Sequence, residues 1–369
     1  MSPVRFRAAP KRVRFGKPTR SGWLGEGEMH FVSDNQSGLH PAVLTALAEA
    51  SSGNAAGYGE DPLTAAAETA VEQLFETPCS VFFVTTGTAA NALALSALCP
   101  PWGAIYCHMG SHVQNDENTA VELYTGGARL VGIPGREGKP ALEQMRAHIQ
   151  TATIHGVHNA RPGAISLSNV TESGTVYGPE ELASYRALAD EHGLYLHVDG
   201  ARFANAVVSS GATPAELTWR AGVDCLSFGL TKNGGMATEA VVIFNQSVAE
   251  QFEYRRKRAG HLWSKHRFLA AQWLALLDGD IWLKNAKHAN DMAQKLANGF
   301  LQRADVNVPW PVQANEIFPV IPAELRSALR EAGMQFYDWP AQADMTRFVT
   351  SFATEATDVE AALAIISSA

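Results

Sequence analysis

The chain has 369 residues, of which 46% are hydrophobic and 18% charged, so it can bury a large core and is not a disordered protein. No stretch approaches the roughly 18 uninterrupted apolar residues that a membrane helix needs, so we expect no membrane partner. The four cysteines are scattered and form no C-x-x-C pair, which favours reduced, buried thiols and a cytoplasmic location. They are Cys79, Cys99, Cys107 and Cys225.

Charge is distributed unevenly along the chain. Residues 1–25 contain seven Lys and Arg and no acidic residue, and taking these seven from 29 leaves 22 basic residues against 37 acidic ones. A body this acidic argues against nucleic acid as a partner, because phosphate contacts need a basic face. The basic start lacks the apolar segment of a secretion signal, and we expect residues 1–28 to be a flexible extension.

From Gly38 to about residue 254 the sequence alternates between strand, turn and helix. Helices are predicted where a proline or a polar cap precedes an apolar period, at 40–51, 62–76, 88–98 and 179–192. Strands are predicted at short apolar runs that end at polar residues, at 80–86, 104–107, 128–133, 164–167, 194–198, 223–228 and 240–244. This alternation predicts an α/β domain of three layers, with helices on both faces of a mostly parallel sheet.

After about Tyr254 the pattern changes. Helices are predicted at 268–277, 281–300, 322–332 and 358–366, and strands at 306–308, 316–321, 335–338 and 346–352. We therefore expect a large domain over residues 29–260 and a smaller C-terminal α+β domain over residues 261–369. Parallel sheets bind ligands at the carboxyl ends of their strands, so the residues just past each predicted strand are the candidate site.

The run Thr86-Gly87-Thr88-Ala89-Ala90-Asn91 joins a predicted strand directly to a helix. Free backbone N–H groups at the start of the helix can bind a phosphate, which Gly87 allows to approach and to which Thr86 and Thr88 offer hydroxyls. A plain strand-to-helix turn explains this run equally well. It is neither a Walker A loop nor a G-x-G-x-x-G, which weakens a nucleotide-binding interpretation.

Asp199 ends the predicted buried strand Leu194-Tyr-Leu-His-Val-Asp199 and is followed by Gly-Ala-Arg202. A carboxylate at this position can keep a pyridine nitrogen protonated and so make the ring an electron sink. The alternative is a helix N-cap. Arg202 carries a planar guanidinium that can bind a carboxylate through two parallel hydrogen bonds.

Lys232 stands in a loop after another apolar strand, in Cys225-Leu-Ser-Phe-Gly-Leu-Thr-Lys232-Asn-Gly-Gly. Small residues flank it, which disfavours a role as a surface charge only, although lysines in loops are common. Near a pyridinium and Asp199, such an amine can form an imine with an aldehyde. The phosphate turn, Asp199 and Lys232 in this order form a combination that chance rarely produces.

From about Phe31 to the C-terminus the sequence resembles the low-specificity L-threonine aldolases, type I enzymes of pyridoxal 5′-phosphate (PLP) with the aspartate-aminotransferase-like fold. The resemblance rests on the three motifs above and on four further segments: Ser33-Asp34-Asn35, Tyr58-Gly59-Glu60-Asp61-Pro62, Ser111-His112 and Arg347-Phe-Val-Thr. It implies a PLP-dependent transferase-like large domain with a smaller C-terminal domain.

The resemblance also implies roles for individual residues. Lys232 is expected to carry PLP as a Schiff base, Asp199 to pair with its ring nitrogen and His112 to stack on the ring and take part in proton transfer. Thr86, Gly87 and Thr88 would hold the phosphate. The substrate carboxylate is expected to be bound by Ser33, Arg202 and Arg347, while Tyr58 is expected to reach across a subunit interface.

The sequence departs from the family pattern at three places. Asn169-Val170-Thr171-Glu172 stands where many members have an asparagine-threonine-histidine run, and Asp116 replaces a common aromatic residue on the substrate side. Ser264-Lys265-His266-Arg267 replaces a run whose arginine supplies a phosphate contact from a neighbouring subunit, a contact that Lys265 or Arg267 could substitute. These departures leave open which group acts as the base and which side chains are preferred.

Simpler interpretations remain for some of these residues. His112 could pair with His108 or Glu117 on a surface turn, and Arg347 could form a structural salt bridge. A metal site at His108, His112, Asp116 and Glu117 is conceivable, but PLP chemistry requires no metal and we expect none.

The expected reaction is cleavage of L-threonine, L-allo-threonine and related β-hydroxy-α-amino acids, phenylserine among them, to glycine and an aldehyde. The alternatives are another type I PLP reaction, β-elimination or transamination, and a non-catalytic PLP-binding protein. The resemblance implies a homo-oligomer with shared active sites, at least a dimer and more specifically a tetramer.

Overall fold

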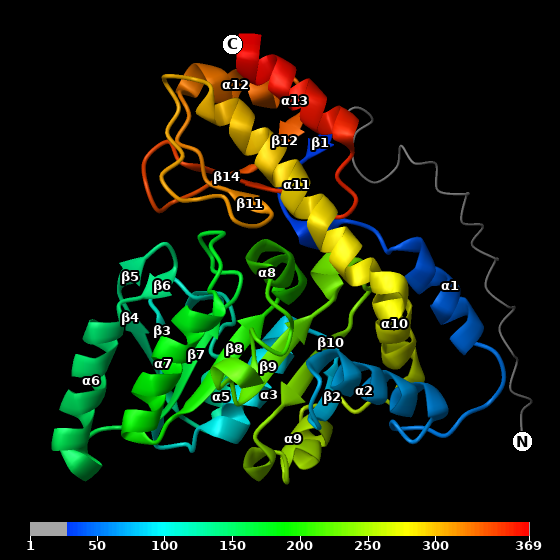
Figure 1. Cartoon of the computed structure of the whole chain (residues 1–369), viewed down its shortest axis with the longest axis vertical. Coiled ribbons are helices and arrows are strands. Elements are labelled where there is room, and N and C mark those ends of the chain that lie inside the picture. The colour runs from blue at the N-terminus through cyan, green and yellow to red at the C-terminus, as the bar shows by residue number, and fades with distance from the viewer. Residues whose placement is uncertain (1–27, 369) are drawn as a thin grey trace, which may run out of the picture.

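The computed structural model describes residues 28–368 and consists of a larger unit around a central sheet and a smaller unit above it (Figure 1). The expected flexible extension therefore lies outside the described residues, apart from Glu28. No helix in the described part of the chain combines the length and the apolar character needed to cross a membrane.

The central sheet has seven strands in the order β2-β10-β9-β8-β7-β3-β4. Only β10 runs antiparallel to its two neighbours, and the other pairings are parallel. The strands are β2 (Ser80–Val84), β3 (Gly103–His108), β4 (Arg129–Ile133), β7 (Arg161–Ser168), β8 (Tyr195–Gly200), β9 (Cys225–Gly229) and β10 (Glu239–Ile243). The α/β class with a mostly parallel sheet is confirmed.

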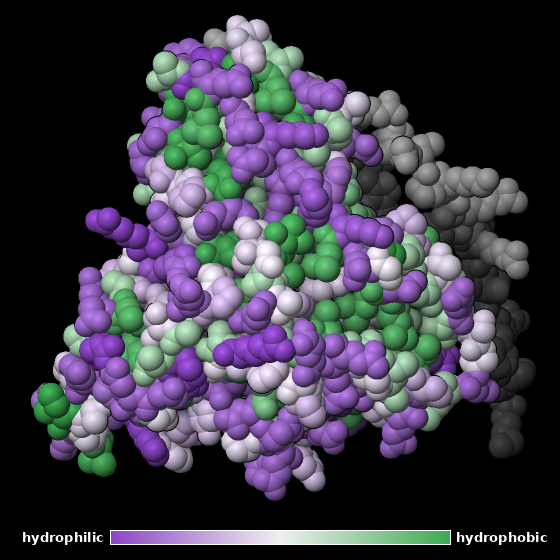
Figure 2. Space-filling model, viewed as in Figure 1, coloured by the Kyte–Doolittle hydropathy of each residue, from purple (hydrophilic) through white to green (hydrophobic). Residues whose placement is uncertain are grey.

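Helices cover both faces of this sheet and complete three layers (Figure 1). One face packs with the short α4 (His112–Asn115) and with α3 (Gly87–Leu98), α5 (Ala120–Thr125) and α9 (Phe252–Arg258). The other face packs in a core with α1 (Pro41–Ala50), α2 (Pro62–Phe75), α6 (Leu142–Ile154), α7 (Pro179–His192), α8 (Phe203–Ser210) and α10 (Arg267–Leu277). Polar residues cover most of the visible surface and the apolar ones form small patches, as expected when both apolar faces of the sheet are buried (Figure 2).

The pleat of the strands decides which side chains meet each helix layer. On β8, Leu196 and Val198 belong to the core with α7 and α8, so His197 and Asp199 point to the opposite face, toward α3. The buried imidazole of His197 lies between the hydroxyls of Ser166 and Ser227, at 2.9 Å from each. Burial lowers the pKa of His197 to about 4, so this histidine is a neutral hydrogen-bonding group of the sheet.

The smaller unit combines three helices with two small sheets. The helices are α11 (Ile281–Leu301), α12 (Ala323–Glu331) and α13 (Ala356–Ser368). Strands β11 (Glu316–Ile317), β14 (Thr346–Val349) and β13 (Tyr337–Asp338) form an antiparallel sheet, and β1 (Met29–His30) pairs in parallel with β12 (Met334–Gln335). A separate hairpin in the larger unit joins β5 (Gly135–Arg136) and β6 (Lys139–Pro140).

Helix α11 belongs to both units. Trp282 and Ala286 near its start lie in the core of the larger unit, whereas Met292 and Phe300 lie in that of the smaller one. The domain limits at residues 28 and 260 stay predictions. The packing divides the chain differently, because Phe31 lies in the core of the smaller unit and α10 in that of the larger one.

The strand predictions in the C-terminal part were partly wrong. Residues 306–308 form only an isolated bridge, between Asn307 and Val320, and the strand expected at 316–321 ends at Ile317, two residues before Pro319. The strand expected at 335–338 is two strands in different sheets, with the buried Phe336 between them. Very short strands leave too few residues for a period of two to stand out.

Helices α6, α8 and α9 of the larger unit were not predicted, and their starts carry no side-chain cap. Their N-cap residues Ala141, Arg202 and Gln251 make no side-chain hydrogen bond to the helix. Polar N-caps are the strongest local sign of a helix start.

The core of the larger unit is centred on aromatic rings. The ring of Phe228 on β9 contacts those of Phe203, Trp273 and Trp282 with centroid distances of 5.2, 4.8 and 5.5 Å, all edge to face. Each such pair adds about 0.5–1.5 kcal/mol beyond the buried area. Phe228 therefore couples the sheet to α8, α10 and α11.

We predict that Phe228→Leu lowers the free energy of unfolding by about 1–3 kcal/mol, because it removes these ring contacts and leaves unfilled volume. Urea denaturation of the full chain measures the change. The control is Tyr254→Leu, which alters a side chain that is 78% exposed and should stay within about 0.5 kcal/mol of the unmodified protein. Equal effects of the two substitutions would contradict this account of the core.

Candidate active site

A cavity of about 310 Å³ lies at the carboxyl ends of the parallel strands. Seven of the predicted site residues line it: Thr86, Gly87, Thr88, His112, Asp199, Arg202 and Lys232. They come from the start of α3, the start of α4, the end of β8 and the loop after β9. The topology thus brings together residues that are up to 146 positions apart (86 to 232).

The phosphate turn caps α3. Thr86 is the N-cap, and its Oγ1 accepts a hydrogen bond from the N–H of Ala89 at 3.2 Å. The position that a Cβ of Gly87 would occupy has no atom within 4 Å, so the helix start is open toward the cavity. An open helix N-terminus with free N–H groups is suited to an anion such as a phosphate.

Asp199 is buried and receives hydrogen bonds on both oxygens. Its Oδ1 accepts from the N–H of Ala201 at 3.0 Å, and its Oδ2 accepts from Nδ2 of Asn91 on α3 at 2.8 Å. The hydrogen bond from Ala201 only closes a local turn, but the one from Asn91 fixes the carboxylate against the neighbouring layer of helices. Asn91 was part of the quoted turn motif, yet its role was missed because a hydrogen bond between layers leaves no spacing signal.

His112 lies beside this carboxylate in a network that includes Glu117. Its Nδ1 donates to Oε1 of Glu117 at 2.9 Å, and Nδ2 of Asn91 donates to the same oxygen at 2.8 Å. The hydrogen bond to Glu117 raises the pKa of His112, while burial raises that of Glu117. His112 remains about 44% exposed, whereas the Glu117 side chain is fully buried, so the expected surface pair is a pair at the cavity wall.

His112, Glu117 and Asp199 also have ligand atoms within 4.8 Å of one another. The Asn91 amide and the His112–Glu117 hydrogen bond already occupy these atoms. The group is therefore a hydrogen-bond network.

Glu172 forms the wall next to His112. Its Oε1 accepts from the hydroxyl of Ser168 at 2.7 Å and from the backbone N–H of His112 at 2.8 Å, while its buried Oε2 has no hydrogen-bond partner among the described residues. Burial raises the pKa of Glu172 to about 7. The sequence marked residue 172 only as a departure from the family pattern.

Lys232 lies in the short helix Thr231–Asn233 after β9. Nδ2 of Asn233 donates to the carbonyl of Trp282 at 2.8 Å, and Nδ2 of Asn285 donates to the carbonyl of Asn233 at 2.9 Å, so α11 clamps the loop. Gly234 has φ +107°, and a Cβ there would come within 2.9 Å of His40, which explains the glycine after the lysine.

Glu239, at the start of β10, is a further acid at the cavity. Its Oε2 accepts from the N–H of Leu230 at 3.0 Å, and burial raises its pKa to about 7. It was missed because a single acidic residue before an apolar run is also typical of the start of an ordinary strand and so gives no separate signal.

Arg202 is fully engaged by two carboxylates. Its Nε and Nη2 donate to the two oxygens of Asp34 at 2.6 and 3.0 Å, and its Nη1 lies 3.0 Å from Oε2 of Glu316. Burial raises the pKa of Asp34, but the charges of Arg202 and Lys232 and the hydrogen bonds to Asp34 together more than offset this, and the net pKa is lowered. Nδ2 of Asn315 donates to Asp34 as well, at 3.0 Å.

The other predicted residues do not line this cavity. Ser33 caps a short helix through a 3.2 Å bond from the N–H of Asn35, which does line it. Tyr58 is 53% exposed, Asp116 is exposed, and Lys265 lies with Trp263 at a separate hollow.

Arg347 lies in the smaller unit, where its guanidinium stacks on the rings of Tyr337 and Trp339, 5.2 and 4.8 Å from their centroids. Its Nη2 donates to the carbonyl of Val32 at 3.3 Å. No ion pair to Arg347 occurs among the described residues. Burial lowers its pKa.

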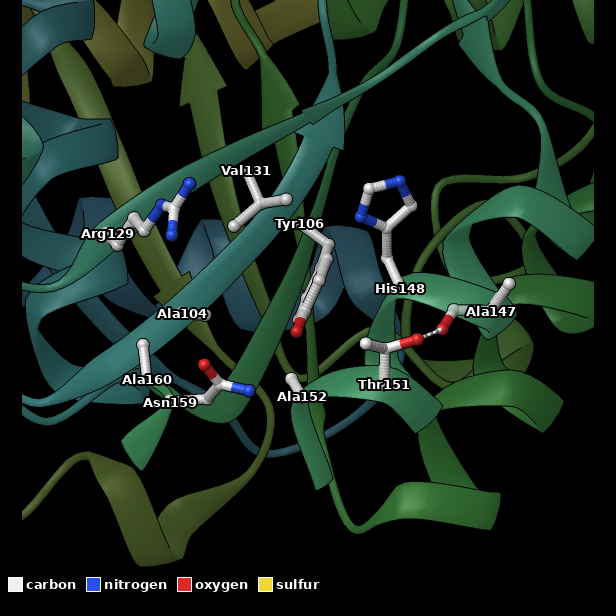
Figure 3. A pocket seen from close by; sticks show the side chains of 10 residues that line it. All are labelled: Ala104, Tyr106, Arg129, Val131, Ala147, His148, Thr151, Ala152, Asn159 and Ala160. Atoms are coloured by element: carbon white, nitrogen blue, oxygen red, sulfur yellow. Dashed lines mark hydrogen bonds between the residues drawn. The ribbon is translucent and has the colours of Figure 1, made fainter. Parts of the chain in front are cut away.

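Two further cavities border the larger unit. One, of about 360 Å³, opens between α6 and the edge of the sheet, and Figure 3 shows Arg129, Tyr106 and His148 around it; none of the predicted site residues lines it. The other, of about 640 Å³, is lined by residues of both units, among them Glu137, Trp310 and Trp339, and includes Glu172.

Comparisons with known proteins agree with this geometry. A family model described as "Beta-eliminating lyase" matches residues 30–323. A curated "Low specificity L-threonine aldolase" from Pseudomonas aeruginosa is 43% identical over 88% of this chain and 93% of the relative. The chain belongs to the low-specificity L-threonine aldolase family.

Two other relatives support the threonine aldolase family. A second "Low specificity L-threonine aldolase", from Pseudomonas sp. strain NCIMB 10558, is 41% identical over 90% of this chain and 95% of the relative. A solved structure of the threonine aldolase from Leishmania major matches with a TM-score of 0.86 and 30% identity, over 92% of this chain and 98% of the other. The match to the aldolase structure includes both units, so the family fold extends through the C-terminal part.

We predict that Glu117→Gln lowers the pKa of His112. The imidazolium form is held by the Glu117 carboxylate, and a neutral amide stabilises it less, so His112 should lose its proton at lower pH in the variant. NMR titration of the His112 ring in cofactor-free protein measures this. Glu143→Gln, an exposed change on α6, is the control, and an unaltered His112 midpoint in Glu117→Gln would rule out the coupling.

Proposed function

We propose that this protein is a PLP-dependent aldolase that cleaves L-threonine, L-allo-threonine and related β-hydroxy-α-amino acids to glycine and an aldehyde. The observation that supports it most is the convergence of the α3 N-terminus, Asp199 and Lys232 on one cavity. The family membership supports the same reaction.

The residues around the cavity fit PLP. The open N-terminus of α3 at Gly87 suits the phosphate, together with the hydroxyls of Thr86 and Thr88, and the doubly hydrogen-bonded Asp199 suits a protonated ring nitrogen. Lys232 supplies the amine that binds the cofactor aldehyde, and His112 supplies a flat ring beside it. When bound, PLP stabilises negative charge at the Cα of an attached amino acid.

Arg347 is the best candidate for the substrate carboxylate. Arg202 is held by Asp34 and Glu316, which makes it a fixed positive charge at the cavity wall. Ser33 directly precedes Asp34 in the chain. The guanidinium of Arg347 keeps donors that no described carboxylate uses. A planar fork of this kind binds a carboxylate through two hydrogen bonds and would orient the Cα–Cβ bond for cleavage.

We propose that Tyr58 and Lys265 act across subunits of a homo-oligomer, at least a dimer and more specifically a tetramer, and that Asp116 lies on the substrate side. The backbone N–H of Tyr58 donates to the carbonyl of Ser264 at 3.2 Å, so Tyr58 and Lys265 share one exposed region. Such a region can complete the site of a second copy. The four buried, free cysteines fit a reducing compartment, and we propose that the protein works in the cytoplasm.

The decisive experiment is a product assay with purified protein, PLP and L-threonine. Glycine and acetaldehyde in equal amounts support the aldolase. Ammonia release would instead support β-elimination, the reaction that the family description names, and a requirement for an amino-group acceptor would support transamination. PLP binding with no turnover of any of these substrates would support a non-catalytic protein.

We predict that Lys232→Ala abolishes borohydride-stable attachment of the cofactor. Lys232 is the lysine that lines the cavity with Asp199, so reduction of the wild-type protein should leave pyridoxyl on the peptide containing residue 232. Peptide mass spectrometry reads this out. The control Lys287→Ala changes an exposed lysine on α11 and should label as wild type, and pyridoxyl on a different lysine in Lys232→Ala would overturn the assignment.

We predict that Arg347→Lys lowers kcat/KM for L-threonine by about 10- to 150-fold, which corresponds to a charge-assisted contact of about 1.5–3 kcal/mol. Lysine keeps the charge but not the fork geometry. PLP absorbance should not change, because the cofactor does not use this contact. Steady-state kinetics decide the matter, and a wild-type kcat/KM would leave Arg347 with a structural role in stacking on Trp339.

A further inference from the structure

Glu172 is the one described residue that lines both the candidate active site and the larger cavity beside it. The active site holds Lys232 and Asp199, and the neighbouring cavity of about 640 Å³ is walled by Trp310, Trp339 and the β5–β6 hairpin. Its position at the junction of the two cavities distinguishes Glu172 from the other acidic residues of the site. Glu239 lines the active site alone, and Glu117 lines neither cavity.

The contacts of Glu172 leave one of its oxygens available. Oε1 is fixed by the Ser168 hydroxyl and by the backbone N–H of His112, which hold the carboxyl in one orientation. Oε2 is buried and has no hydrogen-bond partner among residues 28–368. A buried carboxylate oxygen without a donor costs free energy, so a donor from a bound molecule would be favoured there.

The position of the reacting bond follows from the proposed function. The amino group of the substrate belongs at the Lys232 end of the first cavity. Arg347 lines neither cavity but stacks on Trp339, a wall of the second cavity, so it can hold the substrate carboxylate from that side. In this placement Cα and Cβ lie close to the junction of the two cavities, where the unpartnered oxygen of Glu172 can accept a hydrogen bond from the hydroxyl on Cβ.

We propose that Glu172 is a catalytic residue of this protein and accepts the proton of the substrate β-hydroxyl. The inference rests on the proposed aldolase function. The O–H bond breaks and its proton moves to Glu172, while the electron pair of that bond forms the C=O of the leaving aldehyde. The Cα–Cβ bond breaks at the same time, its electron pair remains on Cα, and the proton that Cα then takes up completes glycine and restores the balance.

The neighbouring base His112 is less suited to this step. Its Nδ1 is bound to Glu117, and the same hydrogen bond raises its pKa and favours the protonated form. The backbone of His112 instead donates to Glu172, so α4 holds the carboxyl in place. A protonated His112 beside Glu172 also favours the ionised carboxylate that accepts the proton.

The reaction should depend on pH through Glu172. Its pKa is raised to about 7 by burial, and the carboxylate is the accepting form, so kcat should fall as the pH falls through about 7. The charged or titratable groups that face Glu172 are Asp199, His112, Arg202, Tyr177, Cys107 and, across the second cavity, His108, Arg136 and Glu137. Several of these also titrate, so only a variant can assign the acid limb.

The test is Glu172→Gln, which keeps an oxygen for Ser168 and for His112 N–H but cannot take the proton. We expect kcat for L-threonine to fall by about 10²- to 10⁴-fold and the acid limb near pH 7 to disappear. Glu172→Asp keeps a carboxylate and should restore part of the rate. Glu143→Gln, an exposed glutamate on α6, should behave as wild type.

Two measurements separate catalysis from structure. The dissociation constant of PLP, from fluorescence quenching, and the thermal midpoint of the cofactor-free protein should be unchanged in Glu172→Gln. Exchange of the α-proton of glycine into deuterated solvent should also stay within a few-fold of wild type, because glycine has no hydroxyl to deprotonate.

The outcomes distinguish the inference from the function on which it rests. Threonine cleavage by Glu172→Gln at nearly the wild-type rate, with the acid limb retained, would overturn the role of Glu172 alone. Equal losses in threonine cleavage and glycine exchange would also overturn it, since Glu172 would then act on the whole site. Absence of threonine cleavage in the wild type, with PLP bound, would instead contradict the proposed function.

Discussion

The guanidinium of Arg202 is the point at which three distant parts of the chain meet. It contacts Asp34 from the N-terminal segment and Glu316 from β11, and all three side chains are largely buried. Removing one member of such a group leaves an uncompensated buried charge, which costs about 3–5 kcal/mol. The ion pairs therefore fix the smaller unit against the end of β8, and with it the position of Arg347 relative to the cavity.

The same end of the sheet concentrates negative charge. Burial raises the pKa of Glu117, Glu172 and Glu239, and in each case the charge of Asp199 raises it further. Carboxyl groups this close cannot all ionise without a cation between them. A cation that pairs with Asp199 therefore makes the other three acids easier to ionise, and the protonation states of the cavity are coupled through this one residue.

The sequence was sufficient for the central sheet of the larger unit and for the residues at strand ends. Asp199 and Lys232 each follow an apolar run directly, and the turn at Gly87 links a clear strand to a clear helix, so local patterns mark them. Asn91 and the Asp34–Arg202 pair were missed because their partners lie in other layers, up to 168 positions away. Spacing along the chain carries no trace of such contacts.

The smaller unit was less predictable for a different reason. Its strands have two to four residues and its pairings join segments as distant as Met29 and Met334. A period of two cannot be read over two residues, so pairing with distant segments, rather than local pattern, decides these strands. The prediction consequently gave the helices of this unit well and its strands poorly.

Helix α11 has a consequence for how the molecule can be divided. The first half completes the aromatic core of the larger unit and holds the loop of Lys232 through Asn285, and the second half packs in the core of the smaller unit. Dividing the chain anywhere along this helix would expose buried apolar surface of one fragment or the other to water. The two units are thus parts of a single indivisible piece, and neither is a module that could be excised or transplanted alone.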